Sequence, residues 1–183
     1  MKKKLIFSAA LILSLGLAGC STDASKEVTQ TTASSGKTDK ETKNDDTYFK
    51  DNEVKREDLI INITETKVIP VGEKGNERGE TPVFAIWYSL TNLSDKEIEP
   101  VTAWGTTFTA IQDTDPNADN ELGVGYLPDD RFINTELEKI KKDETVENAV
   151  AYDLDDLETP VVLVARQGVE GKVLGEKEYK IKQ

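Results

Sequence analysis

The sequence predicts an all-β protein, a β-sandwich domain that follows a secretory signal peptide and a disordered linker. Apolar residues recur at a spacing of two through residues 48–183, which is typical of strands. Clusters of turn residues interrupt this alternation about every ten residues. A basic and then apolar N-terminus ends at the single cysteine. These observations divide the chain into a signal peptide (1–19), a linker (20–47) and one domain (48–183).

The N-terminus carries the parts of a secretory signal: Lys2 to Lys4, an apolar run from Leu5 to Leu15, and small residues before a cleavage site. The sequence Leu17-Ala18-Gly19-Cys20 resembles the lipobox of bacterial lipoproteins, in which the sulfur of the cysteine carries a diacylglyceryl group. A membrane-spanning helix is the alternative, but Leu5 to Leu15 would span only about 17 Å of a core of roughly 30 Å. We therefore expect Cys20 to be lipidated and to anchor the protein to the outer face of the cell membrane.

The linker from Ser21 to Thr47 has no aromatic residue and three apolar side chains, Ala24, Val28 and Ala33. Such a segment cannot bury enough surface to offset its ordering entropy, so we expect a disordered spacer with an end-to-end distance of about 30 Å. Docking of the linker onto the domain is the alternative.

Removing residues 1–19 takes away three lysines and no acid from a chain of net charge −12, which leaves 20 basic and 35 acidic side chains and a net charge of −15. This balance argues against binding to nucleic acid or to anionic lipid headgroups. With Cys20 lipidated, no disulfide can form within the chain.

Most strands of the domain are predicted from alternation, Leu59–Ile69 from its isoleucine and threonine content, and Val161–Val164 from a run that is apolar on both faces. The turns are predicted from Gly, Pro, Asn and Asp. The predicted strands are Leu59–Ile69, Val83–Leu90, Trp104–Ala110, Val146–Leu154, Val161–Val164 and a last short strand at Tyr179–Ile181. The predicted turns are Gly72–Gly79, Asn92–Asp95, Asp113–Asn120 and Gly168–Gly175. The predicted core includes Phe84, Ile86, Leu90, Phe108, Val150 and Leu163. Asn134–Lys142 is either a short helix or an extended segment. Seven or so short strands indicate a sandwich.

Several segments together resemble a known family. They are Tyr48–Asp51, Ile61–Ile63, Tyr88–Asn92, Ala103–Trp104, Phe108–Asp113, Ala151–Leu154 and Pro160–Val161. On these the domain resembles uncharacterised immunoglobulin-like lipoproteins of Gram-positive bacteria, which are similar in fold to a secreted immunoprotective antigen of mycobacteria. The resemblance implies an immunoglobulin-like β-sandwich and assigns no catalytic residue. Lys142–Thr145 departs from it, because the family tends to have a proline-glycine turn there.

The residue types present argue against catalysis. Histidine is absent, and lipidation would remove the thiol of Cys20, so the usual general base and thiol nucleophile are both missing. We therefore expect no enzyme. A hydrolase that uses two carboxylates is the least favoured alternative.

One acidic segment has oxygen-bearing side chains at every second position, a pattern that can bind Ca²⁺. These residues are Asp113, Asp115, Asn117 and Asp119. The pattern then departs from a calcium-binding loop, because Ala118 stands in place of glycine and Val124 in place of glutamate. An ordinary acidic turn is therefore favoured over a calcium site. A second acidic cluster, Asp153, Asp155, Asp156 and Glu158, could add ligands, but a solvated connection between strands explains it as well.

Trp87 and Trp104 lie inside strand patterns, so burial is favoured over exposed platforms for sugar rings. What remains is a non-catalytic domain, without a cofactor unless Ca²⁺ binds. We expect it to bind an envelope protein or a wall component, with a small-ligand or calcium-binding lipoprotein as the alternative.

Overall fold

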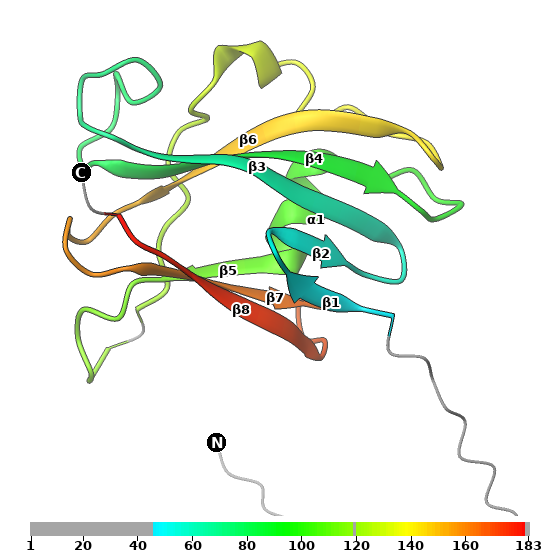
Figure 1. The fold of residues 1–183 in the computed structure, drawn as a ribbon. Helices are drawn as coiled ribbons and strands as arrows, with labels where there is room; N and C mark the ends of the chain where they lie inside the picture. Colours follow the sequence, from blue (N-terminus) through cyan, green and yellow to red (C-terminus); the bar gives the residue numbers. More distant parts are fainter. Residues whose placement is uncertain (1–45, 119, 182–183) are drawn as a thin grey trace, which may run out of the picture. The chain divides into compact units, whose positions relative to one another are not determined.

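The computed structural model describes residues 46–118 and 120–181 (Figure 1). The predicted signal peptide, Cys20 and all of the linker before residue 46 lie outside the described residues. The strands are β1 (Tyr48–Lys50), β2 (Glu53–Lys55), β3 (Leu59–Ile69), β4 (Val83–Asn92), β5 (Phe108–Ile111), β6 (Thr145–Asp153), β7 (Val161–Arg166) and β8 (Val173–Tyr179). The helices are α1 (Pro100–Thr107) and the 3-10 turn η1 (Asp130–Phe132).

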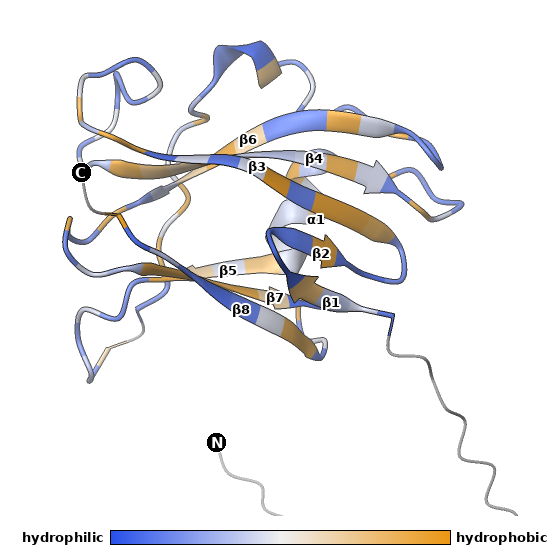
Figure 2. Ribbon diagram, viewed as in Figure 1, coloured by the Kyte–Doolittle hydropathy of each residue, from blue (hydrophilic) through white to orange (hydrophobic). Residues whose placement is uncertain are grey.

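The strands form two antiparallel sheets, in the order β1-β2-β3-β4-β6 and β5-β7-β8. The sheets lie face to face with the apolar core between them (Figure 1). The prediction of an all-β sandwich is confirmed, while its immunoglobulin-like character stays a prediction. In Figure 2, β8 is hydrophilic over most of its length, whereas β5 and β7 carry apolar residues, so β5 and β7 contribute more to the core than β8 does.

A bulge in β3 decides which of its residues face the core. Ile61 and Ile63 pair with the inward-facing Leu90 and Tyr88, but the register shifts between Ile63 and Glu65. Because side chains alternate with a period of two, one extra residue exchanges the two faces. After the bulge, Glu65, Lys67 and Ile69 therefore lie on the outer face of the sheet. There Ile69 joins a second small cluster, with Val83, Ala85 and Ala151.

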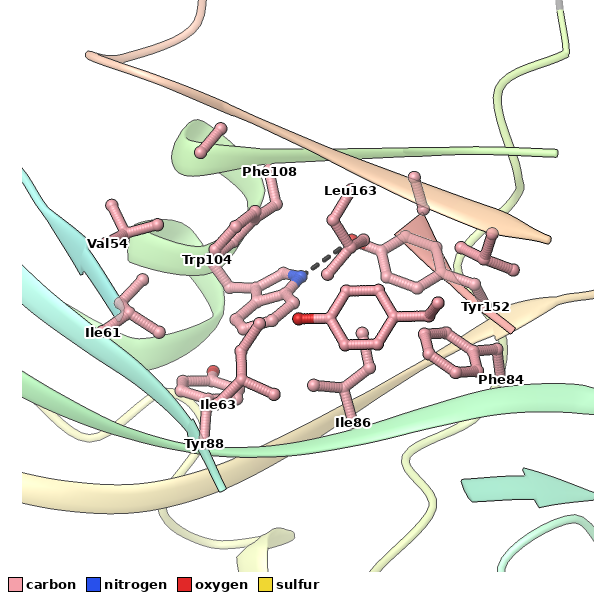
Figure 3. Close-up of a cluster of buried hydrophobic side chains, with 14 of the residues drawn as sticks. Val54, Ile61, Ile63, Phe84, Ile86, Tyr88, Trp104, Phe108, Tyr152 and Leu163 are labelled. Atoms are coloured by element: carbon pink, nitrogen blue, oxygen red, sulfur yellow. Dashed lines mark hydrogen bonds between the residues drawn. The ribbon is translucent and has the colours of Figure 1, made fainter. Parts of the chain in front are cut away.

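The core is built around aromatic rings from both sheets and from α1. Trp104 lies against Tyr88 and Phe108, with ring centroids 4.5 and 4.4 Å away, and its Nε1 donates to the hydroxyl of Tyr152 over 2.7 Å (Figure 3). The predicted core residues Phe84, Ile86, Leu90, Phe108 and Leu163 are buried. Val150 is only half-buried, because β6 is an edge strand.

The strand predicted from Trp104 is wrong over its first half. Residues 100–107 form α1, and β5 begins at Phe108. Pro100 stands at the first helical positions, where its fixed φ favours a helix. The buried residues follow helical spacing, and they are Pro100, Ala103, Trp104 and Thr107. α1 therefore carries the chain from one sheet to the other while it places Trp104 in the core.

The sequence allows either a short helix or an extended segment at Asn134–Lys142, and the structure shows that this segment is not a helix. The single helical turn lies earlier, at η1, where the side chain of Asp129 accepts from the backbone N–H of Arg131. Ile140 forms an extended bridge with Ile98, so a helix cannot continue through it. At the C-terminal end, β8 begins at Val173 inside the predicted turn and ends at Tyr179, before the predicted Ile181. Positive φ at Gly175 lets this strand pass close to Phe49.

The segment after β5 closes one side of the sandwich. Glu121 bridges to Ile111 at the edge of β5, and Val124 bridges to Tyr152 at the edge of β6. It then continues to η1, which lies beyond the larger sheet (Figure 1). No helix within residues 46–118 and 120–181 is long and apolar enough to cross a membrane.

Candidate binding surface

Exposed apolar side chains gather on the segment that joins the two sheets. Nine large apolar residues are exposed in the described part of the chain, and five of them belong to this segment or to the adjoining α1. We call these five the apolar edge: Val101, Val124, Tyr126, Ile133 and Leu137. Val124, Tyr126, Ile133 and Leu137 have exposed fractions of 60–69%. Apolar side chains gathered in this way are typical of interaction sites.

Four of the five residues of the apolar edge line two neighbouring pockets. Val101 and Val124 line one pocket, Tyr126 and Ile133 line a second, and Leu127 lines both. The backbone N–H of Val101 donates to the carbonyl of Glu136 over 3.1 Å, which places α1 beside the Leu137 turn.

Two contacts hold the segment against the larger sheet. The indole N–H of Trp87 on β4 donates to Asp129 over 2.9 Å, and Arg131 donates to the same carboxylate. Gly75, at φ +93°, approaches the carbonyl of Pro128 so closely that a Cβ would lie 2.4 Å from its oxygen. The position of the apolar edge is therefore set by the scaffold. The Arg131 guanidinium holds the pKa of Asp129 well below its usual range, and the Trp87 bond contributes.

A small pocket of about 70 Å³ opens in the apolar edge, between β6, α1 and residues 124–127. Most of its wall is apolar. The lining residues are Tyr88, Val101, Trp104, Val124, Gly125, Leu127, Glu136, Asn148, Ala149, Val150 and Ala151. Val101 and Val124 are exposed, so the mouth of the pocket lies at the surface.

Three side chains with hydrogen-bond donors line this pocket, and two of them already donate to an acceptor within the protein. The hydroxyl of Tyr88 donates to the carbonyl of Pro100 over 3.3 Å, and the indole of Trp104 donates to Tyr152. Burial raises the pKa of Tyr88 above its usual range, and burial raises the pKa of Tyr152 to about 12 despite the opposing Trp104 bond. Both phenols therefore stay neutral at physiological pH.

The third donor is Asn148, which is 1% exposed and whose Nδ2 has no hydrogen-bond acceptor. Its Oδ1 accepts from the backbone N–H of Ala149 over 2.8 Å. This bond fixes the orientation of the amide, because turning it over would place two donors against each other. Leaving a buried donor unpaired costs about 1–3 kcal/mol of folding free energy. Nδ2 of Asn148 is thus the side-chain donor of this pocket that still lacks an acceptor. The other orphaned atom among the described residues, Oε1 of Gln167, lies on a half-buried side chain.

The predicted calcium-loop residues are engaged in turn hydrogen bonds. Asn117 donates its backbone N–H to Asp115 over 2.8 Å, and Asn120 donates to Asp113 over 3.1 Å. Asp119 lies outside the described residues. Within residues 46–118 and 120–181, no group of three or more acidic side chains is placed to hold a metal ion. Calcium binding here stays a prediction.

The second acidic cluster is organised by a buried amide. Oε1 of Gln112 accepts from the backbone N–H groups of Asp155 and Asp156, and its Nε2 donates to the carbonyls of Asp156 and Thr159. Thr114 reaches Asp155 over 3.3 Å, so the two acidic loops are neighbours.

Of the two tryptophans, Trp104 is buried, as predicted, and Trp87 is half-buried beneath Asp129. Trp104 presents no ring to solvent, whereas the half-buried Trp87 lines an open hollow beside Asp129 and Arg131.

Residues 34–167 match the family described as DUF5067, a domain of unknown function. The chain belongs to the DUF5067 family. No curated protein matches it. The fold is similar to a solved structure described as that of "a putative lipoprotein from Staphylococcus aureus", with a TM-score of 0.61 and 23% identity over 74% of this chain and 92% of the other. At this identity the likeness shows the fold alone. The predicted link to the mycobacterial antigen stays a prediction.

Sequence reasoning did not find the pocket of this DUF5067 domain. The alternation predicts Asn148 in a strand and facing the core, as observed. The other residues that line the pocket come from β4, α1 and the segment before β6, and their approach to Asn148 cannot be deduced from the sequence. A polar residue at an inward-facing position between Val146 and Val150 was the available signal.

Proposed function

We propose that the protein is a lipoprotein anchored through Cys20 on the outer face of the cell membrane, and that its domain binds a partner at the envelope without catalysis. The gathering of exposed side chains in the apolar edge carries this proposal. Binding energy at interfaces comes largely from a few apolar anchors near the centre of a patch, and the apolar edge supplies such anchors around a pocket.

Two further observations support it. The Leu17-Ala18-Gly19-Cys20 sequence is what an anchored protein needs, and the structurally similar staphylococcal protein is described as a putative lipoprotein. Within the described domain, β1 lies at a different corner from η1 and the loop before β4 (Figure 1). A tether that enters at β1 therefore leaves the loops around η1 free to meet a partner.

Site-specific photo-crosslinking on live cells tests the proposal. A photoreactive residue at position 126 should capture a defined partner, because Tyr126 is exposed in the apolar edge. The matched control is position 169, since Val169 is an apolar residue that is even more exposed (72%, against 60% for Tyr126) but lies in the turn between β7 and β8. Val124→Glu should abolish capture from position 126, and Cys20→Ala should release the protein or leave its precursor uncleaved.

Equal capture from positions 126 and 169, or capture that Val124→Glu leaves unchanged, would show that the apolar edge is not the binding surface. Full membrane retention of a mature-sized Cys20→Ala product would contradict the anchor.

A further inference from the structure

The pocket in the apolar edge has a defined chemistry. It combines an apolar wall, a buried amide donor without an acceptor at Asn148, and the carboxylate-bearing Glu136. A ligand that satisfies all three has a small apolar group, a carbonyl oxygen to accept from Asn148, and an N–H to donate to Glu136. An acetamido group has these parts in this order: methyl, carbonyl, N–H.

The size of the pocket agrees with a group this small. Its volume of about 70 Å³ is roughly half that of an engineered cavity of about 150 Å³ that accepts benzene. A methyl and a carbonyl fit such a space, whereas an aromatic ring does not. The body of the ligand would remain outside, against the exposed parts of Val101 and Val124.

We propose that this pocket binds the acetamido group of an N-acetylated amino sugar. The methyl would pack on the apolar wall and the amide N–H would donate to Glu136. The carbonyl would accept from Nδ2 of Asn148 after a small movement of the side chains that cover this atom. This inference rests on the proposed function, and it names the chemical class of the partner as a neutral N-acetylhexosamine of the cell wall.

Charge and surroundings favour such a sugar over other envelope polymers. The mature chain has a net charge of −15, so polymers of phosphate repeats are repelled while a neutral sugar is not. Tyr126, 60% exposed, follows Gly125 of the pocket wall and lines the neighbouring hollow, and an exposed aromatic ring of this kind can stack on a sugar. A peptide with an acetylated N-terminus presents the same acetamido group, and it serves as a separate arm of the test.

Saturation-transfer NMR on the full-length protein in detergent micelles measures this binding directly. The probe is N-acetylglucosamine, and glucosamine and glucose are the comparison sugars. We expect saturation to be strongest at the acetyl methyl, binding in the millimolar range, and no signal from glucosamine or glucose. N-acetylalanine methylamide is the peptide arm, and it should bind more weakly than the sugar.

Single substitutions test which side chains contact the sugar. Asn148→Leu should weaken binding about tenfold, as expected for the loss of one hydrogen bond to a buried donor. Glu136→Leu, at a half-buried position, should weaken it to a similar degree and does not disturb the β6 strand. Gln167→Leu is the matched control, because it removes the other orphaned amide outside the pocket and should leave binding unchanged. Circular dichroism establishes that each variant is folded.

Equal binding of glucosamine or glucose would overturn the proposal, and so would unchanged binding by both Asn148→Leu and Glu136→Leu. Tighter binding of the acetylated peptide would overturn the sugar assignment. Absence of any ligand signal would mean that Asn148 is satisfied by water only. If position 126 still captures a partner in that case, the proposed function stands and only this inference fails.

Discussion

Gln112 and Asn148 are both fully buried amides, yet their surroundings differ. Gln112 follows β5 and has backbone partners at both ends of its amide, which it uses to close the loop from Asp155 to Thr159. Asn148 in β6 has a partner for its oxygen and none for its nitrogen. Asn92 resembles Gln112, because its amide bonds Lys96, Ile140 and Ser94.

This difference in hydrogen bonding distinguishes buried amides that hold the scaffold together from the buried amide that lines the candidate binding pocket. Where a buried amide shapes a loop, the fold satisfies its polar atoms, as burial requires. Asn148 lines two hollows that open at the surface, so a small movement of the side chains over its Nδ2 would let an acceptor from outside the chain reach it. Local departures from complete hydrogen bonding are expected at functional sites. The comparison therefore predicts different consequences for removing each amide.

Gln112→Leu should have the largest effect. It removes the acceptor of Asp155 N–H and the donor to the carbonyl of Thr159, and it leaves those groups without partners. We expect the free energy of unfolding to fall by about 3 kcal/mol, because water can reach part of the loop but not all of it. The melting temperature should drop by about 10 °C. Thermal and urea unfolding measure both quantities, and a loss below about 1 kcal/mol would mean that the amide does not hold the loop.

Asp129→Asn should have an intermediate effect that depends on pH. Arg131 holds the pKa of Asp129 below its unfolded value of about 3.9. A lowered folded pKa stabilises the native state above that value, and this stabilisation is lost as pH falls below about 4. We expect Asp129→Asn to reduce the unfolding free energy by about 1 kcal/mol at pH 7.

The wild type and Asp129→Asn should converge in stability as pH falls below about 4. The adjacent exposed acid gives the control, Asp130→Asn, which removes one acid from the same turn and leaves the bonds of Asp129 to Trp87 and Arg131 in place. A difference between Asp129→Asn and wild type that is the same at low and neutral pH would show that packing, and not charge, explains it.

The fold could be predicted where one strand face is apolar. The alternation at Val83–Leu90 and the isoleucine and threonine content of Leu59–Ile69 give strands at nearly the observed bounds, because burial of a strand face favours a period of two and β-branched residues. From Trp104 onward the alternation of apolar residues predicts a strand, but the buried residues Pro100, Ala103 and Thr107 follow helical spacing and the segment forms the end of α1. The departure at Lys142–Thr145 has a local explanation: Asp143 has φ +64°, which a glycine adopts without cost.

The pocket could not be predicted, for a different reason. Its wall comes from β4, α1, β6 and the segment between β5 and β6, and its key property is an absent contact. Sequence patterns report what one residue prefers, whereas an unpaired donor is defined by every neighbour that fails to reach it. The sequence indicates Asp113 and Asp115 as candidate calcium ligands, yet in the structure their side-chain oxygens accept hydrogen bonds within their own turn.

Asn148→Leu should have the smallest effect on stability, and this completes the comparison. Replacing the amide removes a buried donor that has no acceptor, which favours the folded state. It also removes the acceptor of Ala149 N–H, which disfavours it. The two contributions oppose each other and leucine fills a similar volume, so we expect the unfolding free energy to change by less than about 1 kcal/mol in either direction. Urea unfolding under the conditions used for Gln112→Leu provides the measurement. A loss as large as that of Gln112→Leu would mean that Asn148 belongs to the scaffold, and the distinction between the two amides would then fail.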